Sequence, residues 1–476
     1  MSNTNPARGM RDFLPDQIRK RNYVIGVIKE VYEKYGFEPL ETPTIENLST
    51  LTNKYGEEGD QLMFKILKRG EKLAKKLEAG EIRNENELTD LALRYDLTVP
   101  LARVVANNKN ELPKFFKRYQ IQPVWRADRP ARGRYREFYQ CDVDAIGSKS
   151  MIVEAELCSA VSEILERLGF EDFEIRINHR SFLTGVLEHV GLQGKSKIEA
   201  LVAIDKLDKI GFEGVAKELQ DRKISADKSD RLLSFFSFAD DFPQRMQRKI
   251  ETTDVNLLSR KNEAINDSWL NASEDYLQRS EIGLKGLREL RNVLSLFGLN
   301  GSANFIRLDP TLARGLSYYT GAIFEVVLTN GDFSGSIAGG GRYDGLIGMF
   351  GKEEIPAVGF SLGLERILLI MEERGMFPDD LTTNAADVLV TLWSEETAAE
   401  SLKLAAELRR NGLRVTVYPE ADKLGKQFKY ADQIDVKFVC VLGESEIAEK
   451  KVTVKNLKTG EQETLFVEEA IEKIRN

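Results

Sequence analysis

Polar and charged side chains recur at every second position between Arg134 and Asp144, where they could bind a substrate that carries both phosphates and amino groups. In a β-strand, alternate side chains lie on the same face of the sheet. One face would then carry Arg134, Arg136, Phe138, Gln140, Asp142 and Asp144. Guanidinium groups bind phosphate oxygens in pairs and keep their charge. The order along this face therefore suits a ligand with phosphates at one end, an aromatic base in the middle and an NH-bearing group at the other.

The stretch that leads into this face is locally cationic. Between residues 114 and 137 the chain has eight Lys or Arg residues and two acids, within a protein of net charge −8. Arg126 follows a mostly apolar run, which places it at the end of a half-buried strand, and a buried arginine needs an anionic partner. The alternative is that residues 128–133 and their neighbours form a solvated basic hairpin.

Three other segments combine arginine with small residues. In residues 309–321, Arg314 precedes a glycine and two tyrosines, and residues 338–345 contain three consecutive glycines followed by an arginine. Residues 359–367 read as a strand that runs into a helix. Arg366 falls in its first turn, where the helix dipole disfavours a cation unless an anion is bound nearby. Each segment also has a simpler interpretation, because a tight turn or a loop before a strand would use the same glycines.

Two further features are weaker indications of chemistry. Residues 191–196 resemble a phosphate-binding loop, but that motif needs a glycine where this chain has His189, so a turn beside a helix is the better interpretation. His179 and His189 are the only histidines, which is too few for a histidine metal site. We therefore expect structural histidines, no metal cluster built from protein side chains, and no histidine base in catalysis.

Composition limits the class of protein. The 476 residues are 42% hydrophobic and 30% charged, and the length suggests about two to four domains. A pI near 5.4 argues against nonspecific coating of polyanions, although a local basic patch can still bind nucleic acid. The three cysteines (141, 158 and 440) have no paired spacing, which indicates a reducing compartment. No membrane span or export signal is recognisable, so a cytoplasmic location is expected.

The elements that must position these residues follow two different patterns along the chain. Strand patterns are expected at residues 37–45, 63–67, 91–96, 119–125, 136–146, 173–177, 304–308, 322–328 and 335–338. Amphipathic helices are expected at residues 16–35, 97–107, 151–168 and 362–374. Two prolines in residues 37–45 favour an edge strand there. Antiparallel strands with helices packed on them predict an α+β domain.

The remaining segments predict an insertion and a second domain. Residues 181–302 are rich in charged helical segments, and we expect a helical insertion domain within the α+β domain of residues 1–180 and 303–376. Residues 377–385 are polar and contain proline, as a linker would. Strands and helices alternate in residues 386–476, which predicts a small α/β domain.

Together these segments resemble the class II aminoacyl-tRNA synthetases, and among them the histidyl-tRNA synthetase family. Pro43, the hairpin of Arg126 that ends in Arg-Tyr-Arg-Glu-Phe, and Gly-Leu-Glu-Arg at 363–366 are similar to motifs 1, 2 and 3 of class II. Residues 314–319 (Arg-Gly-Leu-Ser-Tyr-Tyr) and 339–344 (Gly-Gly-Gly-Arg-Tyr-Asp) resemble the two signature segments of the family. Segments 8–15, 94–100 and 425–432 fit the same family, so the resemblance covers nearly the whole chain except 181–302. It implies a class II catalytic sheet and a C-terminal anticodon-binding domain.

The resemblance implies a role for each candidate residue. ATP, with Mg²⁺, would lie on the sheet with adenine on Phe138 and with its α-phosphate and the histidine carboxylate at Arg126, while Arg314 would stabilise charge during the attack. The ATP-binding set is Arg126, Asp128, Arg134, Phe138 and Arg366. The histidine-binding set is Asp96, Thr98, Arg126, Gln140, Asp144, Arg314, Tyr318 and Tyr319, of which Asp144 and the two tyrosines would meet the imidazole.

The same resemblance implies tRNA(His) and L-histidine as partners and a homodimer as the assembly. Candidate tRNA contacts are Lys426, Gln427, Lys429, Arg129 and Arg132. This chain departs from the family pattern at Ser317, where Asp is frequent, and at Asp128, where bacterial members often have Glu. The alternative is a non-catalytic paralogue that serves as the regulatory subunit of a histidine-biosynthetic ATP phosphoribosyltransferase. Such paralogues usually lack the C-terminal domain and the signature arginines, both of which this chain keeps. A general nucleotide-binding regulator has no feature in its favour.

Overall fold

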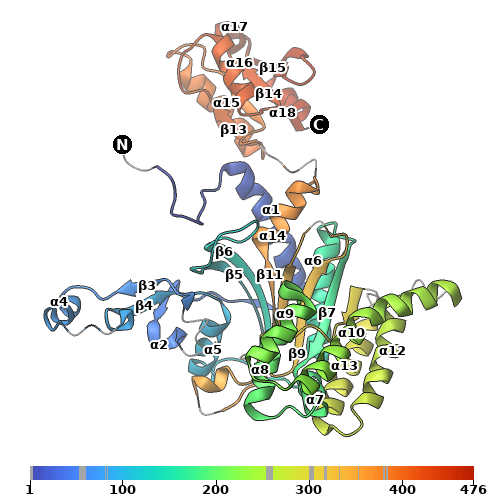
Figure 1. Cartoon of the computed structure of the whole chain (residues 1–476). Coiled ribbons are helices and arrows are strands. Elements are labelled where there is room, and N and C mark those ends of the chain that lie inside the picture. Colours follow the sequence, from blue (N-terminus) through green and yellow to red (C-terminus); the bar gives the residue numbers. More distant parts are fainter. Residues whose placement is uncertain are drawn as a thin grey trace. The chain divides into compact units, whose positions relative to one another are not determined.

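The computed structural model describes residues 4–52, 61–80, 82, 84–253, 261–299, 305–315, 319–331, 333–351, 353–378, 381 and 384–475. The chain divides into two compact units (Figure 1). The first unit comprises Met1–Asp12 and Arg21–Phe377, and the second comprises Phe13–Lys20 and Pro378–Asn476.

An eight-stranded sheet forms the centre of the first unit, in the order β1-β5-β6-β11-β10-β9-β7-β8. Its strands are β1 (Glu38–Pro39), β5 (Phe116–Trp125), β6 (Glu137–Ile146), β11 (Ala357–Gly363), β10 (Ser336–Arg342), β9 (Ala322–Leu328), β7 (Phe173–His179) and β8 (Ile306–Leu308). The six strands from β5 to β7 pair antiparallel, and the two edge strands pair parallel with their neighbours. The expected α+β architecture on an antiparallel sheet is therefore confirmed.

The hairpin of β5 and β6 carries the alternation that the sequence indicated, but over a shorter span. Its register pairs Phe116 with Ile146 and Trp125 with Glu137. Because β6 begins at Glu137, the expected extension of the strand face to Arg134 and Arg136 is wrong. The Arg136 side chain instead donates from Nε to the backbone carbonyl of Asp128 (3.0 Å), which closes the loop between the two strands.

Helices cover one face of this sheet with apolar side chains. They are α1 (Pro15–Lys34), α6 (Ile152–Arg167) and α14 (Leu364–Glu373). Val24 and Ile28 of α1 and Val161 of α6 share one core cluster with Cys141 and Val143, which are odd-numbered residues of β6. The even-numbered residues of β6 project to the opposite face, because successive side chains of a strand alternate. That opposite face is the one available to a ligand.

A smaller three-stranded sheet, in the order β2-β4-β3, lies between β1 and β5 in the sequence. Its elements and neighbours are β2 (Ile45–Asn47), α2 (Leu48–Leu51), β3 (Lys65–Leu67), α4 (Glu71–Glu78), the 3₁₀ turn η1 (Glu85–Glu87), β4 (Thr89–Leu93) and α5 (Thr98–Asn107). The two prolines in residues 37–45 predicted an edge strand, and β1 does occupy an edge of the large sheet.

Between β7 and β8 the described residues are almost entirely helical. The helices are α7 (Arg180–His189), α8 (Gly194–Ile204), α9 (Leu207–Asp221), α10 (Ala226–Thr253), α12 (Lys261–Tyr276) and α13 (Glu281–Gly298) (Figure 1). Phe182 of α7 and Leu287 of α13 belong to the same core cluster as the large sheet. Gly191, with φ of +84°, lies in the turn between α7 and α8, which confirms the helix-flanking interpretation of residues 191–196.

The second unit alternates strands and helices, as its sequence pattern predicted. Its five-stranded sheet has the order β13-β12-β14-β15-β16, and β12 pairs parallel with both of its neighbours. The elements are β12 (Val388–Val390), α15 (Ala398–Arg410), β13 (Val415–Val417), α16 (Leu424–Gln433), β14 (Phe438–Val441), α17 (Glu444–Glu449), β15 (Lys451–Asn456), β16 (Gln462–Phe466) and α18 (Val467–Arg475). None of the helices in the described ranges of the chain is long and apolar enough to cross a membrane.

Candidate active site

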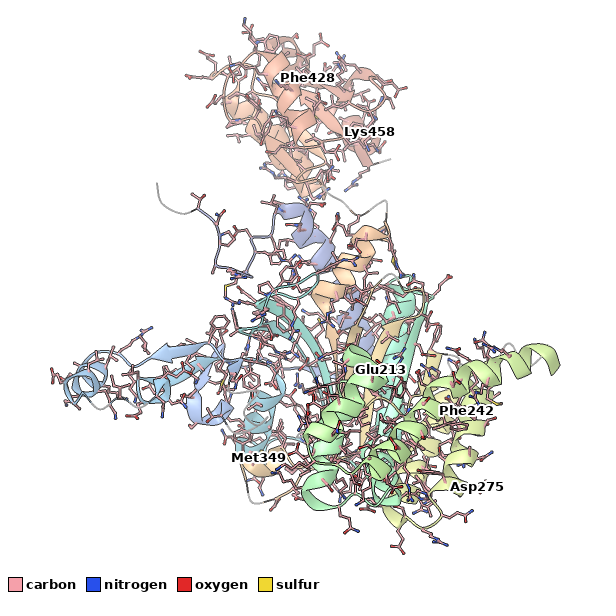
Figure 2. All side chains as sticks on the ribbon, viewed as in Figure 1. Glu213, Phe242, Asp275, Met349, Phe428 and Lys458 are labelled. Atoms are coloured by element: carbon pink, nitrogen blue, oxygen red, sulfur yellow. The ribbon has the colours of Figure 1, made fainter. Side chains whose placement is uncertain are left out.

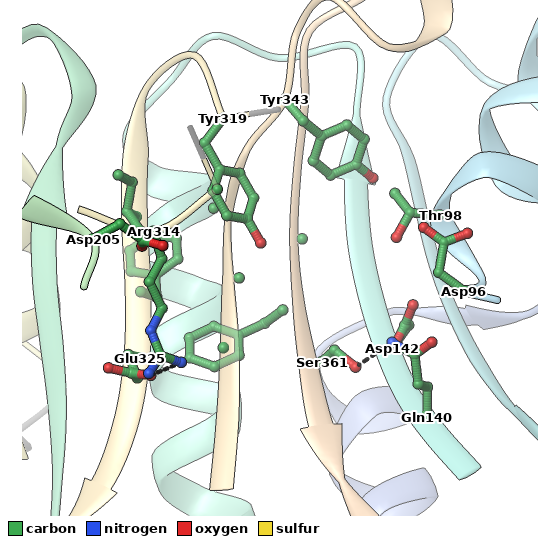
Figure 3. A pocket seen from close by; sticks show the side chains of 18 of the residues that line it. Asp96, Thr98, Gln140, Asp142, Asp205, Arg314, Tyr319, Glu325, Tyr343 and Ser361 are labelled. Atoms are coloured by element: carbon green, nitrogen blue, oxygen red, sulfur yellow. Dashed lines mark hydrogen bonds and ion pairs between the residues drawn. The ribbon is translucent and has the colours of Figure 1, made fainter. Parts of the chain in front are cut away.

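A cleft of about 920 Å³ lies on the ligand-facing side of the large sheet in the first unit. Strands β6, β9, β10 and β11 form its floor, and the start of α5 and helices α8 and α9 contribute to its walls (Figure 3). Seven of the residues that the sequence singled out line it together: Asp96, Thr98, Arg126, Gln140, Asp144, Arg314 and Tyr319. Residues from distant parts of the chain therefore converge on one site of the size that ligand pockets usually have.

One wall of the cleft is acidic and polar. The carboxylates of Asp96, Asp142 and Asp144 are each less than 5% exposed, and Figure 3 shows Asp96 and Thr98 facing the same space as Gln140. Asp96 accepts from the backbone N–H of Val99 (3.2 Å), which ties it to the start of α5. Oε1 of Gln140 is buried with no hydrogen-bond partner among the described residues. This wall thus offers several acceptors to a cationic group.

Burial and crowding shift the titration of this wall. Desolvation raises the pKa of Asp142 to about 7, an effect that Arg118 opposes and Asp144 reinforces. Burial, with help from Asp142 and Asp144, also raises the pKa of the Tyr319 hydroxyl, so this group stays protonated near neutrality. Clustered carboxylates whose charge is disfavoured by burial are stabilised when a cation binds between them.

Asp144 differs from its neighbours because its charge is already paired inside the protein. Oδ2 lies 2.9 Å from Nη2 of Arg118, which is fully buried, and the Tyr343 hydroxyl donates a short hydrogen bond to Oδ1. Arg118 and Tyr343 were not predicted from the sequence as site residues, although Tyr343 lies in a segment that it did single out. Their contacts fix the orientation of the Asp144 carboxylate in the wall.

The opposite part of the site is basic. Nε of Arg126 donates to the carbonyl of Tyr95 (2.9 Å), which fixes this guanidinium at the wall. Arg314 forms an ion pair with the buried Glu325, as Figure 3 shows. Arg366 donates to the carbonyl of Ser336, and burial together with the charges of Arg134, Arg314 and Arg126 lowers its pKa.

Burial lowers the pKa of Arg366, and the charges of Arg134, Arg314 and Arg126 lower it further, so four guanidinium groups gather at this end of the site. Like charges repel, and in a partly desolvated location the repulsion is stronger than in water. The carboxylate of Glu325 opposes this effect at Arg366. The cluster therefore retains an excess of positive charge that an anionic ligand would neutralise.

Of the five residues assigned to ATP, only Arg126 lines the cleft as described; Asp128, Arg134, Phe138 and Arg366 do not. Arg134 donates from Nε and Nη2 to Oδ2 of Asp128 (3.1 and 2.8 Å), so these two candidates pair with each other in the loop. The Arg126 guanidinium carbon lies 5.2 Å from the centre of the Phe138 ring. Phe138 therefore adjoins the basic end, where an adenine could stack.

The consecutive glycines form part of a strand, and the interpretation of them as a turn is wrong. Gly339, Gly340 and Gly341 lie inside β10, between β11 and β9. A Cβ atom on Gly340 would come within 2.1 Å of the carbonyl oxygen of Gly359. The glycines are needed because the backbones of the cleft floor approach one another closely, and β10 adds no side chain to the floor at these three positions.

Other lining residues were given no role from the sequence. They include Asp142, Glu325, Tyr343 and Ser361 from the sheet region, and Arg180, Ile198, Val202, Asp205, Lys206 and Lys209 from helices α7 to α9 and their connections. The alternation of β6 did place Asp142 on the correct face. The helical residues had no local signal, because only the tertiary packing brings them to the cleft. Ser317 and Tyr318 lie outside the described residues.

The candidate tRNA contacts differ in accessibility. Arg129 is exposed, and Arg132 is exposed and paired with Glu373. In the second unit Lys426 and Lys429 are exposed, and Lys426 lies 2.8 Å from Asp422. Gln427 is fully buried: its Oε1 accepts from the Leu392 N–H and its Nε2 donates to the Leu392 carbonyl. Gln427 therefore holds β12 to α16 and cannot reach a ligand outside the domain.

Two protein-family models match the chain, and they divide it near the boundary between the two units. Residues 9–367 match the family model described as histidyl-tRNA synthetase. Residues 387–476 match the model described as anticodon binding domain. The first match covers well over half of the chain and includes the whole cleft.

Curated relatives and solved structures extend over the full length. The chain is 43% identical to the histidine–tRNA ligase of Christiangramia forsetii over 96% of each chain, and 43% identical to that of Porphyromonas gingivalis, again over 96% of each. The crystal structure of histidyl-tRNA synthetase from Nostoc sp. PCC 7120 covers 100% of this chain and 99% of its own, with a TM-score of 0.78 and 30% identity. The chain therefore belongs to the histidyl-tRNA synthetase family of class II aminoacyl-tRNA synthetases.

Proposed function

We propose that the cleft activates L-histidine with ATP and that the chain then transfers histidine to the 3′ end of tRNA(His), the reaction of a histidine–tRNA ligase. The observation that carries this proposal is the division of one cleft into a wall of buried carboxylates and a cluster of arginines. A zwitterionic amino acid next to a polyphosphate has the complementary arrangement of charge.

Histidine occupies the acidic wall in this proposal. Its ammonium group meets Asp96, Thr98 and Gln140, and the unpartnered Oε1 of Gln140 supports this placement because buried acceptors are normally satisfied. Its imidazole lies between Asp144 and Tyr319. Asp144 accepts from one ring N–H and the Tyr319 hydroxyl donates to the other nitrogen, while Tyr343 and Arg118 keep the carboxylate in place.

ATP occupies the basic end. Arg126 bridges the two substrates, because it lines the cleft together with Gln140 and also lies beside Phe138, the proposed adenine platform. Arg134 and Arg366 face the terminal phosphates, with Asp128 orienting Arg134. When ATP binds, Asp128 either leaves Arg134 or shares the Arg134 guanidinium with a phosphate of ATP.

In the activation step an oxygen of the histidine carboxylate attacks the α-phosphorus of ATP. The bond from that phosphorus to the bridging oxygen of the β-phosphate breaks, and pyrophosphate leaves with its electron pair. Arg126 and Arg314 donate to the α-phosphate oxygens as negative charge builds up on them. Each preorganised donor of this kind contributes roughly 10²–10³-fold to the rate.

Mg²⁺ accompanies ATP in the proposed reaction and neutralises phosphate charge. No group of three or more metal-binding side chains occurs in the ranges that the structure describes. The ion is thus held chiefly by the phosphates themselves, as is usual for Mg²⁺ at nucleotide sites. Glu325 lies at this end of the cleft, where it is paired with Arg314.

The tRNA, assembly and compartment complete the proposal. Residues 386–476 act as the anticodon-binding domain, with Lys426 and Lys429 on its surface, and residues 377–385 connect it to a catalytic domain of residues 1–180 and 303–376. Residues 181–302 form the helical insertion. We place the enzyme in the cytoplasm as a homodimer. Cys141, Cys158 and Cys440 are buried free thiols, which agrees with a reducing compartment.

Charging of tRNA tests the complete reaction. The chain should attach labelled histidine to a tRNA(His) transcript in the presence of ATP and Mg²⁺, and it should not charge a tRNA of another specificity or use another amino acid. A folded protein that charges neither transcript would refute the proposal.

The regulatory alternative rests on fold likeness alone. A structure described as an ATP phosphoribosyltransferase regulatory subunit/histidyl-tRNA synthetase from Bacillus halodurans C has a TM-score of 0.70 and 21% identity to this chain. This chain has the candidate substrate-binding residues in the described ranges, and it also has the second unit. These features favour the enzyme.

Binding of histidine should depend on the protonation of Asp142. With its pKa raised to about 7, the carboxylate is charged above that pH and neutral below it, so attraction for the ammonium group weakens as the pH falls. Between about pH 8 and about pH 6 its charged fraction drops about tenfold. We expect the ratio of histidine KM in Asp142→Asn to that in the unmodified enzyme to be large at high pH and to approach one at low pH.

Protonation of the substrate histidine changes the KM of both proteins in the same way, so its effect cancels in this ratio. The KM for ATP serves as the internal control and should keep a constant ratio between the two proteins. A histidine KM ratio that does not change with pH would contradict the assignment of this titration to Asp142.

A further inference from the structure

Residues 7–12 lie ahead of α1, and none of them lines the active-site cleft. This N-terminal segment passes the loop that joins β5 to β6 (Figure 2), where the carbonyl of Gly9 accepts from the backbone N–H of Arg136 (2.8 Å). A Cβ atom on Gly9, whose φ is +83°, would come within 2.8 Å of Cγ of Arg136 and within 2.9 Å of Cγ of Pro130. The N-terminal segment is therefore packed tightly against the loop that carries Arg134.

Arg11 of the N-terminal segment contacts two other elements at once. Its guanidinium carbon lies 3.5 Å from the centre of the Tyr135 ring in the β5–β6 loop, so the two groups are stacked. Its Nη2 donates to Oε2 of Glu365 in the first turn of α14 (2.5 Å). Arg11 therefore ties the β5–β6 loop to the start of α14.

Both residues that this side chain contacts are neighbours of an arginine that is proposed to face ATP. Arg134 precedes Tyr135, and Arg366 follows Glu365. The loop and the helix lie close together here, because a Cβ atom on Gly133 would come within 3.3 Å of Cγ of Arg366. Burial lowers the pKa of Arg366, and the charge of Arg134 lowers it further, as expected of two cations that repel each other. A connection between the loop and the helix must oppose this repulsion.

Glu365 is a firm attachment point for such a connection, because it is itself held in place. It is 6% exposed, and its two oxygens accept from Nη1 of Arg21 at 2.9 and 3.0 Å. The Arg21 side chain in turn lies over the ring of Tyr139 on β6, at 4.7 Å. Removal of Arg11 would leave Glu365 with this second arginine partner, so a substitution there does not leave a buried charge unpaired.

We propose that Arg11 is a positioning residue that holds Arg134 and Arg366 at the separation required by the terminal phosphates of ATP. This inference rests on the proposed ligase function, which places those phosphates at the two arginines. Arg11 acts through Tyr135 and Glu365, and it keeps two like-charged side chains together before the phosphates neutralise them. A site that is ordered in advance loses less binding free energy when its ligand arrives.

Calorimetric titration of the full chain with MgATP, AMP and histidine separates this role from a general structural one. Arg11→Ala should lower the affinity for MgATP by about fivefold or more, since a cation–ring contact has an energy of this order. Its affinities for histidine and for AMP, which lacks the β- and γ-phosphates, should change by less than about twofold. The melting temperature should stay close to that of the unmodified chain, because Glu365 keeps its contact with Arg21.

Substitutions of the stacked ring test whether Arg11 acts through the loop. Tyr135→Ala should weaken MgATP binding as Arg11→Ala does, and the double variant should be no weaker than the weaker single variant, because both changes break one contact. Tyr135→Phe keeps the ring and should bind MgATP with the affinity of the unmodified chain. Arg8→Ala removes an exposed arginine of the same segment and serves as the matched control, which should also bind normally.

Three results would overturn the proposal: unchanged MgATP affinity in Arg11→Ala, an equal loss of affinity for MgATP, AMP and histidine, or additive effects of Arg11→Ala and Tyr135→Ala. Failure of the ligase function gives a different result. The unmodified chain would then show no histidine-dependent ATP–pyrophosphate exchange, whatever the MgATP affinity of the variants.

Discussion

Arg314→Ala should lower histidine-dependent ATP–pyrophosphate exchange by at least about 10²-fold while histidine still binds. Arg314 lies across the cleft from Asp96 and Asp142, so we expect it to act on charge that develops at the α-phosphate and not on the ammonium or imidazole of histidine (Figure 3). Exchange kinetics measure the loss of activity, and calorimetric titration measures the binding of histidine.

A structural effect of the same substitution must be separated from this catalytic effect. Removal of Arg314 takes an ion-pair partner from the buried Glu325, and loss of a partner from a buried charge is costly. The double variant Arg314→Ala/Glu325→Gln should recover the lost melting temperature and should still lack exchange activity. Near-normal exchange in Arg314→Ala, or recovery of exchange in the double variant, would remove Arg314 from its proposed catalytic role.

Deletion of the chain after Asn384 should reduce tRNA charging by about 10²-fold or more and reduce ATP–pyrophosphate exchange far less. Every residue that lines the cleft belongs to the first unit, whereas the family match described as anticodon binding domain lies wholly in the second. Loss of several phosphate contacts lowers affinity for a nucleic acid by orders of magnitude, with a strong dependence on salt.

Charge reversal in the full-length chain is the control for this deletion, because it keeps both units. Lys426→Glu combined with Lys429→Glu should raise the KM for tRNA and leave the exchange rate unchanged. The same reversal at Lys403 and Lys473, which lie on α15 and α18, provides a matched comparison and should have a smaller effect. If exchange and charging fell equally in the deletion, the assignment of roles to the two units would be incorrect.

Local patterns in the sequence predicted the main sheet well. The strand patterns of residues 119–125 and 136–146 identified β5 and β6, and the prolines before Thr44 identified an edge position. Strand periodicity also placed Gln140, Asp142 and Asp144 on one face. These predictions succeeded because each depends only on neighbouring residues and the two-residue repeat of a strand.

Features that depend on distant residues were not predictable in the same way. The glycines of β10 looked like a turn, because only the closeness of Gly359 on β11 shows why side chains are excluded there. Gln427 looked like a candidate tRNA contact, and its burial follows from hydrogen bonds to Leu392, which is 35 residues away. Likewise, the partners of Asp144 lie at positions 118 and 343. The sequence supplies the side chains, and the packing decides which of them reach the cleft.

The central claim is that the arginine cluster and the carboxylate wall act on ATP and histidine in one reaction. Histidine-dependent exchange of labelled pyrophosphate into ATP measures this reaction directly, without tRNA. The account predicts robust exchange with histidine, none with the other amino acids, and saturation in both substrates. Well-folded protein that shows no histidine-dependent exchange, although it binds histidine, would contradict the account and favour a regulatory role.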